Sequence, residues 1–307
     1  MLILVFRQFL FIKNKTKYVL HSSFGGDNMD IGFVGAGKVG FTLGKYFKDK
    51  NLNVIGYYSR SLESAKEAAE FTNSKYFSNI EDLVKECDTI FITTVDDAIK
   101  GIWSNIKELS INNKIICHCS GSLSSKIFSN IDSYNSYGYS IHPMFAFSDK
   151  YNSHKNIHEA FFTIEGSKEK LNVIVNLLET LGNEYKIISS ENKAKYHAAS
   201  VFVSNHVLAL MKEGIELLGD CGFQESEAIK ALYPLFINNA KNIKNGLNNS
   251  LSGPLERGDE STLRKHLDCL NYEEQKLYKL LSKKLLDIAK VKNINRNYKN
   301  IEELIGE

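Results

Sequence analysis

Residues 30–40 of this chain, Asp-Ile-Gly-Phe-Val-Gly-Ala-Gly-Lys-Val-Gly, determine its fold class. Asp30 to Val34 is a short apolar run, which is typical of a strand buried in a parallel sheet. A Gly-x-Gly-x-x-Gly turn follows, and residues 39–48 then repeat apolar side chains at helical spacing. A strand, this turn and a helix in that order predict a dinucleotide-binding βαβ unit.

Each glycine of the turn has an expected role. Gly35 permits the tight turn, Gly37 lets a pyrophosphate approach the backbone, and Gly40 allows the helix to pack against the strand. The helix N-terminus then presents free N–H groups to the phosphates. The alternative is a tight strand–helix turn without a ligand. The residues expected to bind the cofactor here are Gly35, Ala36, Gly37, Lys38, Val39 and Gly40.

The end of the second strand predicts which dinucleotide is bound. An NAD-selective site usually places an acidic residue there, to hold the ribose 2′-hydroxyl. This chain has Ser59, Arg60 and Ser61 instead. Two hydroxyls and a guanidinium suit a 2′-phosphate, so we expect NADP(H) rather than NAD(H). The alternative is that Arg60 is a surface residue without a ligand.

Two further loops follow strands and should line the same crevice. Thr94 and Val95 are expected to contact the cofactor, whereas Asp97 could instead cap a helix that begins near Ala98. Ser120 and Gly121 are expected near the nicotinamide. Ser122 could equally be a helix cap.

The remaining pattern alternates strands and helices with short connections, which predicts an α/β fold with a Rossmann-type, doubly wound parallel sheet. An all-α C-terminal domain is expected to follow from about residue 191, beginning with one long helix over Lys193 to Leu218. Ala194 to Met211 is so apolar that it needs burial on nearly every side, in a helical core or in a dimer interface. The predicted strands are 30–34, 53–58, 88–93, 114–119, 139–142, 160–165 and 184–189, and the predicted helices are 39–48, 62–71, 80–86, 99–109, 168–181, 193–218, 225–245 (with Pro234 as a kink), 261–270 and 272–290.

The expected domain boundaries follow from this reading. Residues 29–155 form the dinucleotide-binding domain, whose sheet extends by strands to about residue 190. Residues 156–290 form the C-terminal domain and 291–307 a tail. Met29 leads straight into the first strand, so residues 1–28 are interpreted as a mis-assigned extension with Met29 as the initiator. A genuine disordered or membrane-touching tail is the alternative.

Composition narrows the class of protein. The chain is 43% hydrophobic and 24% charged, which is ordinary for a globular protein, and 38 basic against 36 acidic residues give a net charge of +2. This balance gives no argument for binding nucleic acid or an anionic membrane. Five cysteines without a Cys-x-x-Cys pair indicate neither a disulfide framework nor a metal site, and they favour a cytoplasmic protein.

Four motifs extend the interpretation from a fold to a family: residues 118–122 (His-Cys-Ser-Gly-Ser), 140–144 (Ser-Ile-His-Pro-Met), 196–199 (Tyr-His-Ala-Ala) and 252–259 (Ser-Gly-Pro-Leu-Glu-Arg-Gly-Asp). Together they resemble a bacterial family of Rossmann-like oxidoreductases whose C-terminal helical domain has no assigned function. That family is similar in build to ketopantoate reductases, pyrroline-5-carboxylate reductases and the 6-phosphogluconate and β-hydroxyacid dehydrogenases. The resemblance spans residues 29–290 and implies NADP-linked reduction or oxidation of a small carbonyl or imine compound.

Reduction of a ketone leaves an alkoxide that a nearby Lys or His can protonate. In the β-hydroxyacid dehydrogenases this group is a helix Lys with an Asn one turn on. Here neither Lys193 nor Lys195 has Asn four residues later, so His197 ranks above Lys195, with Asn205 as an orienting hydrogen-bond partner. A core role for His197 is an equal alternative, and both lysines are by default solvated. The proton donor is therefore left open among His197, Lys195 and Lys193.

Two more residues are candidates for contact with the substrate. His142, at a strand end, faces the expected crevice, although a rigid turn with His142 bonded to backbone is equally plausible. Arg257 could grip a substrate carboxylate, or it could only brace its loop through Asp259, which, like Ser261, reads as a helix cap.

The leading hypothesis is therefore an NADP-dependent oxidoreductase that acts on a small carboxylated carbonyl compound, with 2-dehydropantoate as the first candidate. The alternatives are an imine reductase resembling pyrroline-5-carboxylate reductase and a non-catalytic NADP(H) sensor. A homodimer through the helical domain is expected, with a small molecule as the partner and neither nucleic acid nor membrane.

Overall fold

The computed structural model of the protein describes residues 29–306. The interpretation of residues 1–28 as an extension therefore falls outside the described residues. The chain divides into two compact units, of which the first ends at Phe202 and the second begins at Val203. Each unit is described by itself.

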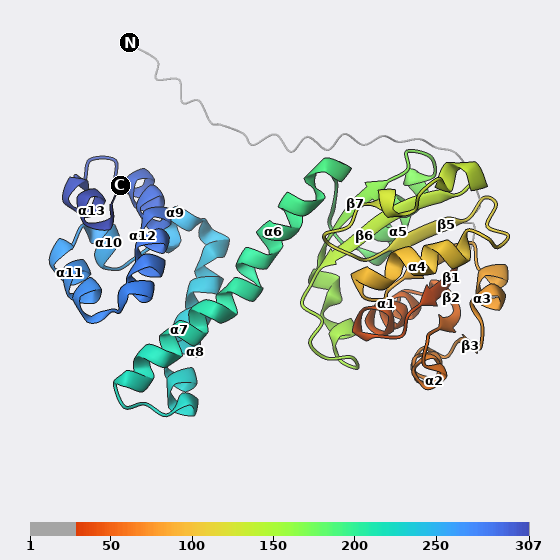
Figure 1. The fold of residues 1–307 in the computed structure, drawn as a ribbon, viewed down its shortest axis with the longest axis horizontal. Helices are drawn as coiled ribbons and strands as arrows, with labels where there is room; N and C mark the ends of the chain where they lie inside the picture. Colours follow the sequence, from red (N-terminus) through yellow and green to blue (C-terminus); the bar gives the residue numbers. More distant parts are fainter. Residues whose placement is uncertain (1–28, 307) are drawn as a thin grey trace, which may run out of the picture. The chain divides into compact units, whose positions relative to one another are not determined.

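The first unit is built on an eight-stranded sheet in the order β3-β2-β1-β4-β5-β6-β7-β8 (Figure 1). The strands from β1 to β6 run parallel, β7 is antiparallel to β6, and β8 is parallel to β7. The order of the first six strands, with its reversal between β1 and β4, is that of a dinucleotide-binding fold, so the predicted fold class is confirmed. The strands are β1 Asp30–Val34, β2 Asn53–Tyr58, β3 Lys75–Phe77, β4 Thr89–Ile92, β5 Ile115–His118, β6 Tyr137–Met144, β7 Phe161–Gly166 and β8 Tyr185–Ile187.

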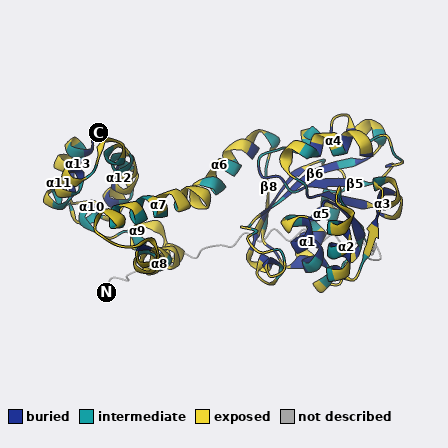
Figure 2. Ribbon diagram, turned by 60° about the horizontal axis from the view of Figure 1, so that its bottom comes forward, coloured by how far each residue is buried: buried dark blue, intermediate teal, exposed yellow. Residues whose placement is uncertain are grey.

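Helices cover both faces of this sheet, and Figure 2 shows the buried strands between them. Phe33 and Phe91 pack on one face with side chains of α1, α2 and α5. Val34 and Ile92 pack on the other face, with Trp103 and its neighbours in α3 and α4. Such two-sided burial explains why these strands are continuous apolar runs. The helices are α1 Lys38–Asp49, α2 Leu62–Thr72, α3 Ile80–Glu86, α4 Asp96–Ile106, α5 Leu171–Leu181 and α6 Lys193–Val203, with 3-10 turns η1 Ser125–Ile127, η2 Ile131–Tyr134, η3 Ser153–Lys155, η4 Ile157–Glu159 and η5 Ser190–Asn192.

The second unit is helical, as predicted. Its core gathers Leu255, Leu263 and Leu286 with Ile301 and Ile305. The last two belong to α13, a helix that the predicted tail did not include. The helices are α7 Asn205–Asp220, α8 Glu225–Asn242, α9 Leu247–Ser250, α10 Pro254–Arg257, α11 Glu260–Cys269, α12 Tyr272–Lys292 and α13 Lys299–Ile305, with the 3-10 turn η6 Ile243–Asn245.

The single long helix predicted over residues 193–218 is wrong. Ser204 separates α6 from α7, with φ −114° and ψ −74°. Its hydroxyl donates to the side chain of Asn205, and Ser and Asn side chains compete with the helical backbone in this way. We expected Ala194 to Met211 to be buried on nearly every side. In α7, which includes the second part of this stretch, no residue is buried. Among residues 29–306, no helix is long and apolar enough to cross a membrane.

Candidate active site

A cleft of about 820 Å³ opens beside the carboxyl ends of β1 and β4, where the strand order reverses. It is formed by the glycine turn, the end of β2 and the start of α4. Ten of the predicted cofactor residues line it: Gly35, Ala36, Gly37, Lys38, Val39, Ser59, Arg60, Ser61, Thr94 and Val95. Three predicted cofactor residues do not: Gly40, Ser120 and Gly121.

The three glycines of the turn differ in what surrounds them. Gly35 has φ +112°, which a residue with a side chain rarely adopts. A Cβ on Gly40 would lie 2.3 Å from the Gly35 carbonyl oxygen and 2.4 Å from Thr93 Oγ1, so Gly40 is a packing residue. A Cβ on Gly37 would meet no atom within 4 Å. The backbone at Gly37 therefore stays open to a phosphate group, which is what a dinucleotide needs.

The rim of the cleft at the end of β2 has no acidic side chain among the described residues that line it. Arg60 is exposed there. Ser61 caps α2, because its side chain accepts the backbone N–H of Ser64 at 3.3 Å. The end of β2 therefore presents hydroxyl and guanidinium groups at the rim of the cleft.

The loop after β4 differs from the prediction in its use of carboxylates. The N-cap of α4 is Val95, which provides no side-chain bond, so the predicted cap by Asp97 is wrong. Asp96 instead accepts hydrogen bonds from Ser120 Oγ at 2.7 Å and from Ser122 Oγ at 2.9 Å. Ser122 is therefore a bracing residue rather than a helix cap, and it holds the loop after β5 against α4.

Lys193 is the largest correction to the predicted site. It was expected to be solvated near a helix start, but its side chain is 2% exposed. Its Nζ donates to the Ser120 carbonyl oxygen at 3.0 Å and to Ser140 Oγ at 2.8 Å. Helix α6 begins at Lys193 itself, directly after η5, and this position directs the side chain to the loop after β5 and to the middle of β6.

Two histidines lie beside Lys193, over the backbone of Gly121. His142 Nδ1 is 2.7 Å from the Tyr196 hydroxyl, so the partner of this nitrogen is a side chain and not the backbone group of the alternative interpretation. The ring centroids of His142 and His197 are 6.0 Å apart. A Cβ on Gly121 would lie 2.4 Å from His197 Nδ1 and 2.9 Å from His142 Nε2, so only glycine fits there unstrained. His197 Nδ1 is buried without a hydrogen-bond partner.

Burial shifts the titration of these groups. It lowers the pKa of Lys193 to about 8, although the carboxylates of Glu165 and Asp96 raise that pKa in part. Burial, with a smaller effect of the Lys193 charge, lowers the pKa of His142 to about 3. Burial also lowers the pKa of His118, on β5, to about 4. At neutral pH the site therefore holds one ammonium group next to a neutral His142.

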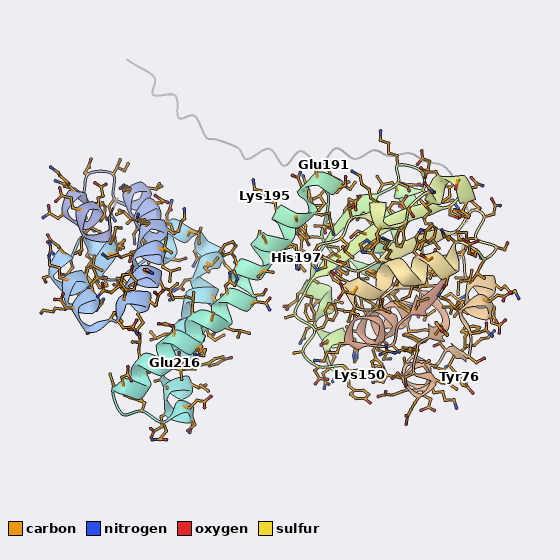
Figure 3. The ribbon with its side chains drawn as sticks, in the orientation of Figure 1. Tyr76, Lys150, Glu191, Lys195, His197 and Glu216 are labelled. Carbon is orange, nitrogen blue, oxygen red and sulfur yellow. The ribbon has the colours of Figure 1, made fainter. Side chains whose placement is uncertain are left out.

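The other predicted catalytic residues are Lys195, Asn205 and Arg257. Lys195 is exposed on α6, where Figure 3 also shows His197. Asn205 and Arg257 are exposed residues of the second unit, so their roles stay predictions. Asp259 caps α11 by accepting the Thr262 N–H, as one of the two expected alternatives.

Tyr196, Ser140 and Asp96 were not among the expected functional residues, and Lys193 was only one of three open candidates for the proton donor, with His197 and Lys195. One signal was available for Lys193, because it forms an i,i+4 pair with His197 and so shares a helix face with it. Nothing in the sequence alone showed that this helix face points at the ends of β5 and β6. Among the described residues, no cluster of His, Cys, Asp and Glu could hold a metal ion.

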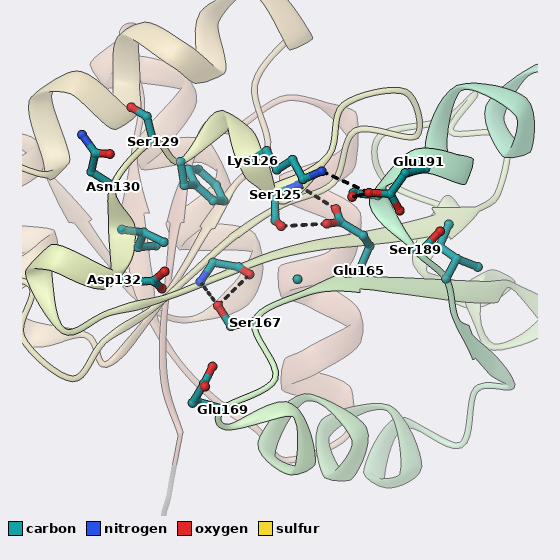
Figure 4. A pocket seen from close by; sticks show the side chains of 16 residues that line it. Ser125, Lys126, Ser129, Asn130, Asp132, Glu165, Ser167, Glu169, Ser189 and Glu191 are labelled. Carbon is teal, nitrogen blue, oxygen red and sulfur yellow. Dashed lines mark hydrogen bonds and ion pairs between the residues drawn. The ribbon is translucent and has the colours of Figure 1, made fainter.

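A second hollow, of about 510 Å³, lies at the carboxyl end of β7 (Figure 4). Glu165 contributes to its wall and is 5% exposed. The carboxylate accepts the backbone N–H of Ser125 at 2.6 Å and the Ser125 hydroxyl at 2.8 Å. No residue of the predicted site lines this hollow.

Comparison with protein families gives two matches that together span both units. Residues 30–120 match the family described as "NADP oxidoreductase coenzyme F420-dependent". Residues 160–285 match "Domain of unknown function (DUF2520)". The pair agrees with the resemblance that the four motifs predicted.

Solved structures with the same fold cover nearly the whole chain. Protein TM1727 of Thermotoga maritima is 30% identical, with a TM-score of 0.67 over 86% of this chain and 99% of that chain. BF3122 of Bacteroides fragilis, assigned as an NADP oxidoreductase, is 24% identical, with a TM-score of 0.68 over 85% of this chain and 98% of that one. The pyrroline carboxylate reductase of Plasmodium falciparum with NADP bound is 17% identical, with a TM-score of 0.59 over 89% and 100%.

A curated relative matches over a shorter stretch. The L-aspartate dehydrogenase of Methanocaldococcus jannaschii is 34% identical over 89 residues, which are 28% of this chain. The chain thus matches about a third, 33%, of the length of that enzyme.

Proposed function

We propose that this chain, which belongs to the family of Rossmann-like NADP oxidoreductases with a C-terminal DUF2520 domain, reduces or oxidises a small carboxylated carbonyl compound. A 2-dehydropantoate-like oxo acid is the first candidate. The observation that carries the proposal is the position of Lys193, a buried ammonium group held against Ser120 at the carboxyl end of β5. Polar groups at this edge of a dinucleotide-binding sheet are where chemistry is expected.

Lys193 can act as the proton donor to the substrate oxygen. A bound NADPH would supply the hydride. The oxygen that gains the electron pair of the C=O bond then needs a proton, and Lys193 Nζ can give one. Its pKa of about 8 keeps most of the lysine protonated at neutral pH while making the proton easier to release than from a solvated lysine.

The test uses NADPH and a panel of substrates. We expect NADPH absorbance to fall with 2-dehydropantoate or a related 2-oxo acid. Lys193→Met should lower turnover about 100-fold or more, which is the usual contribution of a general acid. Lys195→Met is the matched control, because Lys195 is an exposed lysine on the same helix. Unchanged turnover in Lys193→Met would refute this role.

A second candidate reaction is the reduction of a cyclic imine such as pyrroline-5-carboxylate. It is favoured by the likeness of fold to the Plasmodium falciparum reductase. The same panel separates it from the first candidate, since only imines would then oxidise NADPH. Tight NADPH binding without turnover on any oxo acid or imine would instead support a non-catalytic sensor.

Selectivity for NADP(H) over NAD(H) is part of the proposal. Arg60 would bind the 2′-phosphate, so Arg60→Ala should weaken NADPH binding about 10- to 100-fold, which corresponds to one charge-assisted contact. NADH binding should stay within about twofold. Lys66→Ala is the control, because Lys66 is an exposed cation of α2 that does not line the cleft. Equal losses for both cofactors would contradict the assignment.

We also propose a homodimer through the helical part of the chain, in the cytoplasm. Leu208 is 69% exposed and Leu235 is 64% exposed. Exposed apolar side chains of this size favour an interface that removes them from water, and α7 and α8 of a second copy would form it. Light scattering on the intact protein should give twice the mass of one chain. The five unpaired cysteines favour the cytoplasm.

A further inference from the structure

We propose that Glu165 is a positioning residue, whose buried carboxylate is the counter-charge of Lys193 and keeps that lysine protonated. The inference rests on the proposed function and names what sets the protonation state of its acid, Lys193. The geometry of β6, β7 and α6 carries it.

The position of Glu165 follows from strand register. In the antiparallel pair β6 and β7, Ser140 lies directly opposite Glu165. Opposite residues in such a pair project to the same face of the sheet, with Cβ atoms about 5 Å apart. Lys193 Nζ donates to Ser140 Oγ at 2.8 Å. Ser140 therefore contacts Lys193 and also lies opposite Glu165 in the sheet. Among the described residues, no ion pair joins Lys193 to an acidic side chain.

Lys193 needs such a counter-charge because its hydrogen bonds do not supply one. Its two acceptors, the Ser120 carbonyl and the Ser140 hydroxyl, are both neutral. Burying an ammonium group that is only 2% exposed has a large desolvation cost, which a nearby negative charge can partly offset. Glu165 is itself 5% exposed, so little water screens its charge.

The carboxylate of Glu165 is held in place from its other side. Ser125 donates both its backbone N–H and its hydroxyl to the two carboxylate oxygens, as Figure 4 shows. These donors are neutral, so they orient the carboxylate without cancelling its charge. The charge therefore remains available to act on Lys193.

The other titratable groups around Lys193 leave Glu165 as the main anion. His142 on β6 and His118 on β5 have pKa values lowered by burial, to about 3 and about 4, so both are neutral at pH 7. Burial raises the pKa of the Cys119 thiol to about 12, so it is uncharged. Tyr196 and His197 are the neighbours on α6 itself.

The remaining anion is Asp96 at the start of α4, which acts on the pKa of Lys193 less strongly than Glu165 does. Asp96 is exposed and is already bonded to Ser120 and Ser122. Replacing Glu165 by a neutral residue should therefore let Lys193 lose its proton at a lower pH.

The test is a titration of Lys193 in the full chain, which needs no substrate. In protein labelled with ¹³C-lysine, the Lys193 Cε resonance is assigned by its loss in Lys193→Met and followed against pH. We expect Glu165→Gln to lower its midpoint by about one pH unit or more. Glu169→Gln is the matched control, since Glu169 is an exposed carboxylate on the wall of the same hollow, and its midpoint should not move.

An unchanged midpoint in Glu165→Gln would overturn the inference. If the glutamine amide clashes with the Ser125 N–H and the variant does not fold, Glu165→Met removes the charge without adding a donor, and the same shift is expected. Because the titration is independent of turnover, a shift without any activity would leave the inference standing while the proposed reaction fails. Turnover in the wild type without a shift of the midpoint in the variants would support the proposed reaction and overturn the inference about Glu165.

Discussion

At the scale of single residues, Gly121 is the position on which the arrangement of the site depends most. An added Cβ would lie 2.4 Å from His197 Nδ1 and 2.9 Å from His142 Nε2. Gly121→Ala must therefore displace both rings and break the bond between His142 and Tyr196. We expect turnover to fall about 10-fold or more, because small misplacements at a reacting centre are costly.

NADPH affinity should change little in Gly121→Ala, since Gly121 does not line the cofactor cleft. The control is Gly101→Ala in α4, where a Cβ meets no atom within 4 Å and alanine favours a helix. Steady-state kinetics and fluorescence titration with NADPH measure both effects. Normal turnover in Gly121→Ala would show that the two histidines do not need their present positions.

Single residues also show how far the sequence could lead. The glycine turn was predictable because each of its glycines answers a local demand of backbone geometry or close packing. The burial of Lys193 was not, because it depends on where α6 starts relative to Ser120 and Ser140, which are 73 and 53 residues away in the chain. The spacing of residues along the sequence indicates which side chains share a helix face. Which other residues that face contacts depends on how the helix packs in the fold.

At the scale of elements, two glycines at the N-terminus of α1 have different roles: Gly37 leaves space for the cofactor, and Gly40 allows the helix to pack against the sheet. Gly40→Ala would place a Cβ 2.3 Å from the Gly35 carbonyl oxygen and push α1 away from the sheet. Overpacking of this kind costs about 1–3 kcal/mol of the free energy of unfolding. Gly37→Ala meets no protein atom and has φ −78°, so the fold should tolerate it.

The two variants should therefore differ in which property they lose. Gly37→Ala should keep the wild-type urea midpoint and lose NADPH affinity, because the new methyl group occupies the space through which a phosphate approaches. Gly40→Ala should lose stability first. Urea unfolding and NADPH titration on both variants decide this, and a stable Gly40→Ala protein would show that α1 is not held by that contact.

Among the elements, those with a clear hydrophobic period were predicted within a few residues. Strand β3, only three residues long, was missed because Lys75 and Tyr76 give no buried run. The break between α6 and α7 was missed because helical spacing of apolar residues continues across Ser204, while the side-chain bonding of Ser204 and Asn205 acts against it. Short elements and breaks depend on few contacts, which periodicity does not record.

At the scale of the whole molecule, the strand order of the first unit was predictable from the alternation of strands and helices, but the reversed direction of β7 was not. An antiparallel partner for β6 needs only a connection that returns along the sheet, and residues 145–160 carry no regular pattern that indicates it. That reversal matters for function, because it places Glu165 opposite Ser140 and so beside Lys193.

The stability of the molecule should depend on pH through its buried histidines. Burial lowers the pKa of His118 to about 4 and of His142 to about 3, from an ordinary value of 6.5. Between pH 6.5 and 5 the unfolded chain binds protons at these residues that the folded chain does not, so the free energy of unfolding falls as the pH falls. From about pH 7.5 upward the histidines are neutral in both states and this dependence ends.

Each histidine contributes at most about 1.4 kcal/mol per pH unit, so the two together should cost about 3 kcal/mol between pH 6.5 and 5. The window stays above the ordinary range of carboxylates, whose titration would otherwise add to the effect. His118→Asn should roughly halve the slope, since asparagine can still accept the Ser120 N–H that His118 Nδ1 accepts at 3.2 Å. Urea unfolding at several pH values measures the slope, and an unchanged slope in His118→Asn would mean that His118 is already protonated in the folded protein.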